Sequence, residues 1–324
     1  MKIAFVGFRH GHIYALYKMA AACPSVEIVA CVERDATARE KAAQKLGTKI
    51  TDTPYEQVLA GEADIICTGA AYGERGGIII EAMKNGKHVL CDKPVCTRRA
   101  ELLEIERLCN ERGTRLGCML DLRYLGAARL TKELLERGTL GALRILSFTG
   151  QHCIDYAHRP AWYFEEEMHG GTVNDLAIHG VDLVRYMTGL SITQVDGMRQ
   201  WNAYATKHPD FKDSATFMAR LEGGAELMAD VSYSAPSQVF SMPTYWNFKL
   251  WCECGMLTFH LTDPHVTLYM EGEKTPTVLE VPFVEDTCLS DLLAEIAAGS
   301  DTLTKSILAS TREVLSLQEV ADRG

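Results

Sequence analysis

The chain has 324 residues, of which 47% are hydrophobic and 23% are charged, as in an ordinary globular protein. Its formal net charge is -10, and no cluster of Lys and Arg interrupts the acidic balance. Nucleic acid and anionic membranes are bound through cationic patches, so neither is expected as a partner. No apolar run reaches the roughly 18 residues that a membrane span needs. The composition therefore favours a small-molecule ligand. The length is sufficient for two domains.

The 11 cysteines are scattered through apolar segments, without the paired spacing of a disulfide framework or a zinc ribbon. This pattern is typical of thiols that stay reduced, so we expect a cytoplasmic protein. The first residues, MKIAFVGF (1–8), place one basic residue before a short apolar run. No small-residue cleavage site follows, and we interpret the run as a first strand rather than a secretory signal.

Residues 1–120 alternate apolar strand-like runs with amphipathic helical stretches such as 35–46 and 98–111. This alternation predicts βαβ units and an α/β fold, with a doubly wound parallel sheet forming a dinucleotide-binding Rossmann domain. The strand candidates are KIAFVGF (2–8), VEIVACV (26–32), ADIICTG (63–69), KHVLCDK (87–93) and RLGCML (115–120).

The short β-branched and aromatic runs within residues 121–324 predict an α+β domain built on a large, mainly antiparallel sheet. We expect this domain to bind substrate and to mediate oligomerisation. Helices are expected near 125–137, 173–187 and 302–321. No linker separates the two domains, so a ligand site in the cleft between them is expected. The strand candidates are 143–153, ATFMARL (215–221), AELMADVSY (225–233), WNFKLWCE (246–253) and HVTLYM (265–270).

The turn after the first strand is the candidate phosphate site. A dinucleotide fold usually carries G-x-G-x-x-G here, so that backbone N–H groups face the pyrophosphate at a helix N-terminus. Only one glycine keeps its fingerprint position, and a purely structural turn is the alternative. Arg9 or His10 could add positive charge beside a phosphate, but these larger side chains could equally hinder close approach of the backbone. The expected cofactor contacts in the turn are Gly7, Phe8, Arg9, His10, Gly11 and His12.

Glu33 ends the second strand, about 20 residues after the turn, where an acid accepts hydrogen bonds from the adenosine ribose. This position favours NAD. Arg34 follows and could pair with a 2′-phosphate, which leaves NADP open. Solvated residues at a strand end are the alternative interpretation. Thr68 and Lys93, at the ends of later strands, complete the expected cofactor contacts.

Two further segments contain candidate catalytic residues. The segment GKHVLCDKP (86–94) ends a strand with Lys93, and strand carboxyl ends in open α/β sheets face the ligand crevice. In the segment 158–189, Asp175, His179 and Asp182 recur at helical spacing, which places them on one side of a helix. A solvated lysine and a core histidine paired with Asp175 are the structural alternatives.

The set formed by the first turn, CDKP (91–94) and GGTVNDLAIHGVDLVRYMTG (170–189) resembles the glucose-fructose oxidoreductase, inositol dehydrogenase and MocA family (Gfo/Idh/MocA). The resemblance covers essentially the whole chain in order. It places the family's Glu-Lys-Pro lysine on Lys93, with Asp92 in place of glutamate, and its helix acid and histidine on Asp175 and His179. The segment AAYGER (70–75) departs from the family's Thr-Pro-Asn cofactor contact.

The resemblance implies hydride transfer between a nicotinamide and a secondary alcohol or ketone of a sugar, inositol or related polyol. Imidazole titrates near neutral pH, so His179 is the expected base, with Lys93 stabilising charge on the reacting oxygen and Asp175 binding a neighbouring hydroxyl or orienting the ring. A non-catalytic dinucleotide sensor is the alternative within the same family. The expected substrate contacts are Lys93, Arg123, Tyr124, His152, Arg159, Trp162, Asp175 and His179.

The family resemblance also implies a homodimer or homotetramer formed through the second domain's sheet. Polar and aromatic side chains such as Tyr156 stand around the expected site and suit a hydroxyl-rich ligand. A zinc site from His152, Cys153, His158 and His169 uses suitable ligand types but lacks a regular spacing. We therefore expect no metal.

Overall fold

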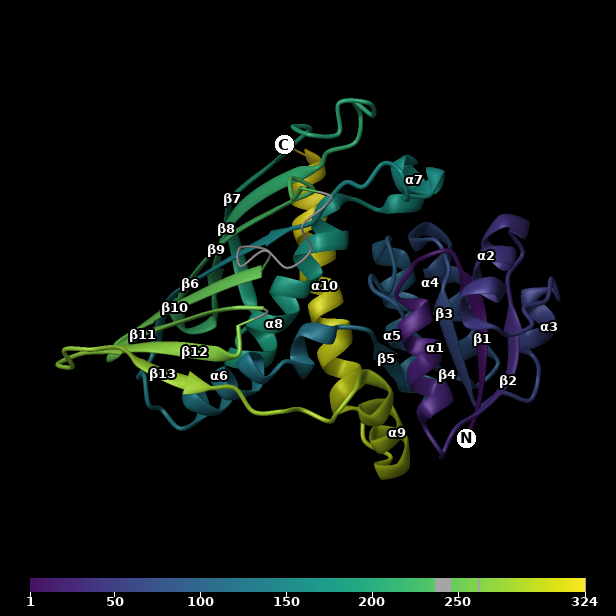
Figure 1. Cartoon of the computed structure of the whole chain (residues 1–324), viewed down its shortest axis with the longest axis horizontal. Helices are drawn as coiled ribbons and strands as arrows, with labels where there is room; N and C mark the ends of the chain where they lie inside the picture. The colour runs from purple at the N-terminus through teal and green to yellow at the C-terminus, as the bar shows by residue number, and fades with distance from the viewer. Residues whose placement is uncertain (237–245, 262, 324) are drawn as a thin grey trace. The chain divides into compact units, whose positions relative to one another are not determined.

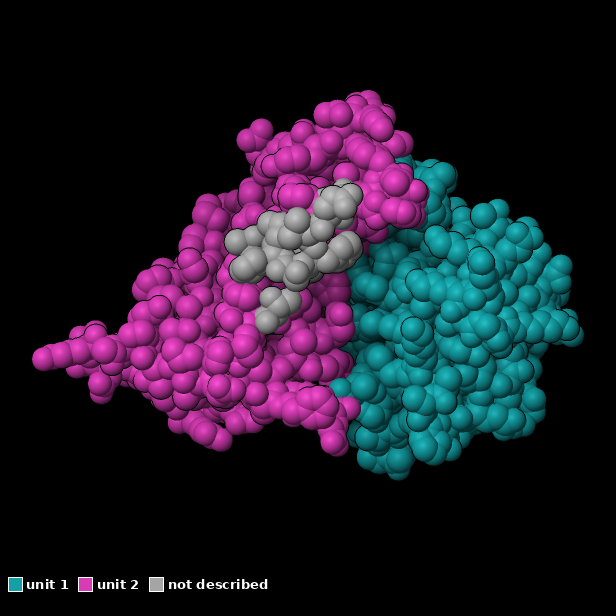
Figure 2. Space-filling model, in the orientation of Figure 1, with its two compact units in different colours: residues 1–120, 160–170, 286–312 teal, residues 121–159, 171–285, 313–324 magenta. Residues whose placement is uncertain are grey.

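The computed structural model describes residues 1–236, 246–261 and 263–323. The chain forms two compact units, coloured separately in Figure 2. The first contains residues 1–120, 160–170 and 286–312, and the second contains residues 121–159, 171–285 and 313–324. Two segments expected in the second domain, 160–170 and 286–312, thus belong to the first unit. Packing explains the second of them, because Leu292 lies so close to Gly117 that an added Cβ would be 3.1 Å from its Cδ2 atom.

The first unit is built on a five-stranded sheet with the order β2-β1-β3-β4-β5, in which every neighbouring pair is parallel (Figure 1). Its central strands are buried on both faces, which is why they read as continuous apolar runs. This order confirms the predicted Rossmann-type parallel sheet. The strands are β1 (Lys2–Phe8), β2 (Glu27–Val32), β3 (Ile65–Gly69), β4 (His88–Cys91) and β5 (Leu116–Cys118).

Helices connect these strands, and their ends follow local sequence signals. The Asp35 side chain accepts a hydrogen bond from the Ala38 amide and so caps α2, while Thr287 and Ser290 form a reciprocal capping box at α9. The helices of this unit are α1 (Ile13–Ala22), α2 (Ala36–Leu46), α3 (Tyr55–Leu59), α4 (Tyr72–Lys84), α5 (Arg99–Arg112), η2 (Ala161–Phe164), α7 (Glu166–His169), α9 (Cys288–Ala298) and the first part of α10 (Thr302–Arg323).

The second unit contains an eight-stranded sheet with the order β13-β12-β11-β10-β6-β9-β8-β7. Among the described strands, β6 and β9 pair in parallel and the other neighbours are antiparallel, which confirms the mainly antiparallel prediction. The strands are β6 (Leu143–Gln151), β7 (Ile192–Trp201), β8 (Ser214–Leu221), β9 (Glu226–Ser232), β10 (Trp246–Cys252), β11 (Gly255–His260), β12 (His265–Met270) and β13 (Thr277–Glu280).

One face of this sheet carries the core of the second unit. Phe148, Phe217 and Phe248 are buried, and the Phe148 ring of β6 lies 6.0 Å from the Phe217 ring of β8 and 5.7 Å from the Phe248 ring of β10. Gly180 of α8 rests against the Phe148 ring, where an added Cβ would be 2.2 Å from a ring carbon. The remaining helical segments are η1 (Asp121–Tyr124), α6 (Gly126–Glu136), the π-helical turn η3 (Val173–Ala177), α8 (Ile178–Thr188), η4 (Glu222–Gly224) and the end of α10.

The opposite face of the sheet exposes apolar side chains on neighbouring strands. Met218 is 52% exposed and pairs across strands with Met228, and Trp251 is 48% exposed and pairs with Ile145. A patch of this kind marks an interaction surface more often than scattered single residues do. Within the described ranges, no helix has the length and apolar character required to cross a bilayer.

Candidate active site

The turn between β1 and α1 is shaped by a close approach to the end of β3. Gly7 has a φ of +86°, and a Cβ there would lie 2.9 Å from the Ala70 Cβ, so only glycine is accommodated. The amides of Arg9 and His10 both donate to the Gly69 carbonyl, at 3.0 and 2.9 Å. These two amides are therefore turned toward the protein, unlike the phosphate-facing amides of a glycine-rich turn.

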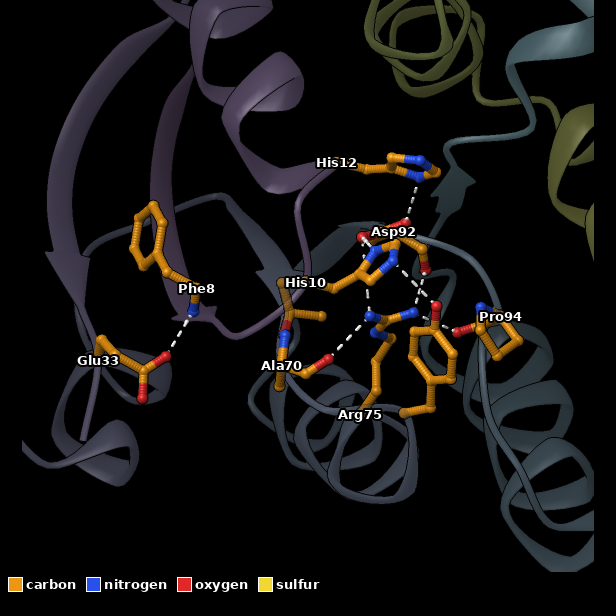
Figure 3. A network of polar contacts seen from close by, with 10 residues as sticks. Phe8, His10, His12, Glu33, Ala70, Arg75, Asp92 and Pro94 are labelled. Atoms are coloured by element: carbon orange, nitrogen blue, oxygen red, sulfur yellow. Dashed lines mark hydrogen bonds and ion pairs between the residues drawn. The ribbon is translucent and has the colours of Figure 1, made fainter. Parts of the chain in front are cut away.

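Glu33 lies buried at the end of β2 and is fixed by three donors. The Phe8 amide donates to its Oε2 atom at 2.5 Å, and the Asp35 amide and Tyr55 hydroxyl donate to Oε1 at 2.8 and 3.3 Å. Figure 3 shows the contact between Glu33 and Phe8. The carboxylate is thus held rigidly beside the first turn, where an adenosine ribose is bound in Rossmann domains.

A cavity of about 270 Å³ adjoins this acid. Arg34, which could bind a 2′-phosphate, forms an ion pair with Glu56 at 2.6 Å and lies over the Tyr55 ring at 4.1 Å. Four glutamates and two arginines line the cavity, so its charge is net negative. The lining residues are Arg9, Glu33, Arg34, Tyr55, Glu56, Leu59, Glu74, Gly77, Ile78 and Glu81.

Lys93 sits in the loop after β4 and is only 2% exposed. The backbone of this loop is held by Arg75 of α4, a fully buried arginine. Its guanidinium donates to the carbonyl oxygens of Asp92 at 2.9 Å, Pro94 at 2.8 Å and Ala70 at 2.8 Å (Figure 3). Arg75 therefore ties together the loops that follow β3 and β4, which include the residue expected to reach the nicotinamide.

Asp92 joins the two histidines of the first turn. His10 Nδ1 lies 2.5 Å from Asp92 Oδ2, and His12 Nδ1 lies 3.0 Å from Oδ1 (Figure 3). Burial lowers the pKa of His10 to about 4. Burial alone would raise the pKa of Asp92, but the neighbouring imidazoles and the Arg75 guanidinium hold it well below its ordinary value. At neutral pH the carboxylate is ionised, and a neutral His10 donates its Nδ1–H to it.

Tyr72 connects this group to an aromatic cluster in the same unit. Its hydroxyl lies 3.0 Å from His10 Nε2, and its ring contacts Trp162, Tyr163 and His169, with centroids 5.0, 5.9 and 5.8 Å away. Trp162, expected among the substrate contacts, is 97% buried in this cluster. Its neighbours therefore lie in the first unit.

The second unit holds the other two residues expected in catalysis. Asp175 is fully buried in the π-helical turn, and the Tyr233 hydroxyl donates to its carboxylate. His179 is 4% exposed in α8; its Nδ1 lies 3.6 Å from an oxygen of the solvent-exposed Asp121. The π turn interrupts the regular helical spacing on which the prediction of a single polar stripe relied.

Aromatic rings surround His179. The His152 ring is stacked at 6.4 Å, and the Trp246 ring meets it edge-on at 5.7 Å. Arg159, another expected substrate contact, donates to the carbonyl oxygens of Ile154 and Cys153 at 3.3 and 3.2 Å. The second unit thus presents imidazole, carboxylate and aromatic groups of the types that bind hydroxyl-rich ligands.

Arg123 and Asp182 form a buried ion pair within the second unit. Arg123 Nε donates to Asp182 at 2.6 Å, and a second guanidinium nitrogen contacts the other carboxylate oxygen. The two side chains are 7% and 2% exposed. Arg123 was expected to bind substrate and Asp182 to share a stripe with His179, but this bidentate contact connects η1 to α8. Tyr124 follows Arg123 at the end of η1.

The residues missed in the sequence are Tyr72, Arg75 and Tyr233, together with the contacts of Asp92. Tyr72 and Arg75 lie in the segment 70–75, which was noted only as a departure from the family pattern. A basic residue early in an apolar helix was an available signal, because burying it requires partners. Lys93 and Trp162 lie in the first unit, whereas Asp175 and His179 lie in the second.

The fold defines an α/β protein of the Rossmann class, with a second unit built on a mainly antiparallel sheet. Residues 1–119 match the family model described as "Oxidoreductase family, NAD-binding Rossmann fold", and residues 128–258 match the GFO/IDH/MocA C-terminal domain. The chain belongs to the Gfo/Idh/MocA family of oxidoreductases. Its first unit is an NAD-binding Rossmann domain.

Curated relatives include the levoglucosan dehydrogenase of Pseudarthrobacter phenanthrenivorans, 27% identical over 57% of this chain and 49% of that protein. The myo-inositol 2-dehydrogenase of Thermotoga maritima is 27% identical over 59% of this chain and 57% of its own length. The match thus spans about half the length of these relatives.

Two solved structures share the fold across nearly the whole chain. An oxidoreductase domain protein from Kribbella flavida has a TM-score of 0.84 at 20% identity, covering 99% of this chain and 96% of that one. A levoglucosan dehydrogenase in complex with NADH and levoglucosan has a TM-score of 0.82 at 16% identity, covering 100% and 97%. These similarities concern the fold.

The residues of the first unit fit a dinucleotide despite the altered turn. An added Cβ at Gly11 would meet no atom within 4 Å, so the space over the start of α1 is open. The backbone amides of residues 11–13 at that helix N-terminus, with the Arg9 side chain, would hold the pyrophosphate. Glu33 and the adjoining cavity would hold the adenosine.

Proposed function

We propose that the protein is an NAD-dependent dehydrogenase that acts on a secondary alcohol or ketone of a sugar, inositol or related polyol. The observation that carries the proposal is Lys93, a buried lysine at the carboxyl edge of the parallel sheet of an NAD-binding domain. The family membership and the buried Asp175 and His179 of the second unit support it. In this proposal, residues 1–120, with the segments 160–170 and 286–312 of the same unit, form the dinucleotide-binding domain, and the rest of residues 121–324 forms the substrate-binding and oligomerisation domain.

Each catalytic residue has a distinct role in this proposal. The bound nicotinamide accepts or donates the hydride. His179 exchanges the hydroxyl proton, Lys93 hydrogen-bonds the reacting oxygen and stabilises its negative charge, and Asp175, held by Tyr233, binds a neighbouring hydroxyl. His152 and Arg159 contact the substrate.

The 11 cysteines carry no disulfide, which supports a reducing compartment such as the cytoplasm.

The proposal is tested by following absorbance at 340 nm while sugars, inositols and sugar acids are offered with NAD⁺ or NADP⁺. We expect turnover of at least one polyol with NAD⁺. Fluorescence titration with NADH is run in parallel. Tight NADH binding without turnover of any polyol would replace the dehydrogenase with the non-catalytic sensor, and absence of NADH binding would contradict both.

A preference for NAD over NADP follows from the charges that line the adenosine cavity. The Phe8 amide holds Glu33 in place, and Arg34 is paired with Glu56, so a 2′-phosphate would meet a cavity in which four glutamates outnumber two arginines. We expect Glu56→Gln to lower the Kd ratio of NADPH to NADH by about tenfold, because it releases Arg34. Fluorescence titration measures both constants without a substrate.

The matched control for this prediction is the double variant Glu56→Gln with Arg34→Ala, in which no cation is released. It should show no gain in NADPH affinity. A parent protein that binds NADPH more tightly than NADH would contradict the assignment.

We also propose that the exposed face of the eight-stranded sheet joins two copies of the chain. Met218 and Met228 lie side by side on this face. Replacing both with Asp should raise the dissociation constant of the oligomer by more than about 100-fold, since it buries unpaired charges. Sedimentation equilibrium measures the change, and Leu103→Asp, at an exposed position of α5, is the control. A monomeric parent at micromolar concentration would contradict the proposal.

A further inference from the structure

The side chains of His10, His12 and Asp92 form a cluster that the proposed dehydrogenase chemistry does not use, since at this turn it uses the backbone amides of residues 11–13. One donor atom from each residue lies within 4.8 Å of the others, and within the described ranges this is the one such group of three or more His, Cys, Asp or Glu residues. All three belong to the first unit, with both histidines on the turn after β1 and the carboxylate after β4. Two imidazoles and one carboxylate are a ligand set that zinc accepts.

The geometry is close to that of a coordination sphere. The observed separations from Asp92 are 2.5 Å to His10 Nδ1 and 3.0 Å to His12 Nδ1. Donor atoms around tetrahedral zinc lie about 3.3 Å apart, given Zn–N and Zn–O bonds of roughly 2.0–2.1 Å. Small side-chain rotations would admit an ion. The hydrogen bond that each Nδ1–H now makes would be exchanged for a bond from the Nδ1 lone pair to the metal.

Tyr72 supplies the outer contact that metal-binding histidines usually have. Its hydroxyl lies 3.0 Å from His10 Nε2. When Nδ1 binds an ion, the proton of the neutral ring lies on Nε2, and the Tyr72 oxygen can accept a hydrogen bond from this Nε2–H. The same 3.0 Å contact therefore serves both forms and fixes the ring in the required orientation.

The charge around the cluster restricts which ion it can take. Arg75 is fully buried with a nitrogen 3.8 Å from Asp92 Oδ2, and Lys93 follows Asp92 directly in the chain. These cations offset the single carboxylate, so Mg²⁺ and Ca²⁺, which require several oxygen ligands, are disfavoured. Imidazole nitrogens favour borderline ions such as Zn²⁺ or Co²⁺.

We propose that His10, His12 and Asp92 bind one borderline divalent transition-metal ion, for which Zn²⁺ is the best match. Three protein ligands leave a fourth position for water or an oxygen of a small ligand, as in catalytic rather than structural zinc sites. The His12 side chain is 33% exposed, which gives solvent access to that position. The proposal departs from the expectation of no metal, because the contacts of Asp92 with both histidines could not be read from the sequence. It goes beyond dehydrogenase activity and is independent of the substrate.

The test uses the full chain, stripped with a chelator and titrated with ZnCl₂ in a calorimeter. We expect one Zn²⁺ per chain, and a Kd at least about tenfold higher in His12→Ala and in Asp92→Asn. Mg²⁺ and Ca²⁺ should give no heat of binding at the same concentrations. His12→Ala removes a partly exposed ring, and circular dichroism of the metal-free variants confirms that they fold.

His158→Ala is the matched control, because it removes an exposed histidine that pairs with Asp155 in the other unit. It should bind Zn²⁺ like the parent. Titration with Co²⁺ separates this cluster from adventitious binding by exposed Cys254, since thiolate ligation gives intense near-ultraviolet absorption and nitrogen and oxygen ligands do not. No Zn²⁺ binding by the parent, equal binding by His12→Ala and Asp92→Asn, or a thiolate spectrum would each overturn the proposal.

Discussion

Replacing His179 with asparagine is expected to lower kcat/KM for the best polyol substrate by about 10²–10⁴-fold. Asparagine keeps a hydrogen-bonding side chain of similar size, but it cannot accept and return a proton near neutral pH. His179 is 4% exposed among the rings of His152 and Trp246, so solvent cannot readily replace it as a base. Initial rates at 340 nm measure the change.

Two controls separate lost chemistry from lost structure. NADH affinity should be unchanged in His179→Asn, because the residue lies in the second unit and the NAD-binding domain is the first. His265→Asn alters another histidine of the second unit, one that pairs with Glu280, and should keep the parent's rate. A His179→Asn variant with full activity would remove this residue from the mechanism.

Lys93 gives an independent test of the same mechanism. Lys93→Met keeps the length of the buried side chain and removes its charge, so we expect kcat to fall by about 10²–10³-fold. The loop itself should persist, since Arg75 holds the carbonyl oxygens of Asp92 and Pro94 rather than the lysine side chain. Retention of the parent's kcat would exclude charge stabilisation by Lys93.

The fold was predictable because periodicity and burial agree along the chain. Strands β1 to β5 are apolar runs, and the segments between them carry apolar residues at helical spacing. Each strand lies within its predicted range. Helix α9 was missed. Its residues lie far along the chain from the Rossmann segment, yet Leu292 packs against Gly117 in that unit. Such a long-range contact leaves no local signal in the sequence.

The candidate site was predictable residue by residue but not as a network. Glu33 and Lys93 follow from their positions at strand ends, because the carboxyl edge of a parallel sheet faces the ligand. The contacts of Asp92 could not be foreseen, since its partners His10 and His12 lie about 80 residues earlier. Only the order of β1, β3 and β4 in the sheet brings these residues into one place.

The buried pair of Arg123 and Asp182 should make the second unit sensitive to the loss of either partner. Asp182→Ala leaves the Arg123 guanidinium buried without its bidentate partner, so we expect the free energy of unfolding to fall by about 3–5 kcal/mol. Urea unfolding followed by tryptophan fluorescence measures it, because Trp201, Trp246 and Trp251 all lie in this unit. Unchanged stability in Asp182→Ala would contradict a structural role for the pair.

The double variant Arg123→Met with Asp182→Leu distinguishes support from substrate binding. Removing both charges while keeping the volume avoids an unpaired buried ion, so most of the lost stability should return. If the double variant also keeps the parent's KM, Arg123 acts by joining η1 to α8. If it is stable but its KM rises by tenfold or more, the guanidinium also binds substrate, and the ion pair with Asp182 is what holds it in position.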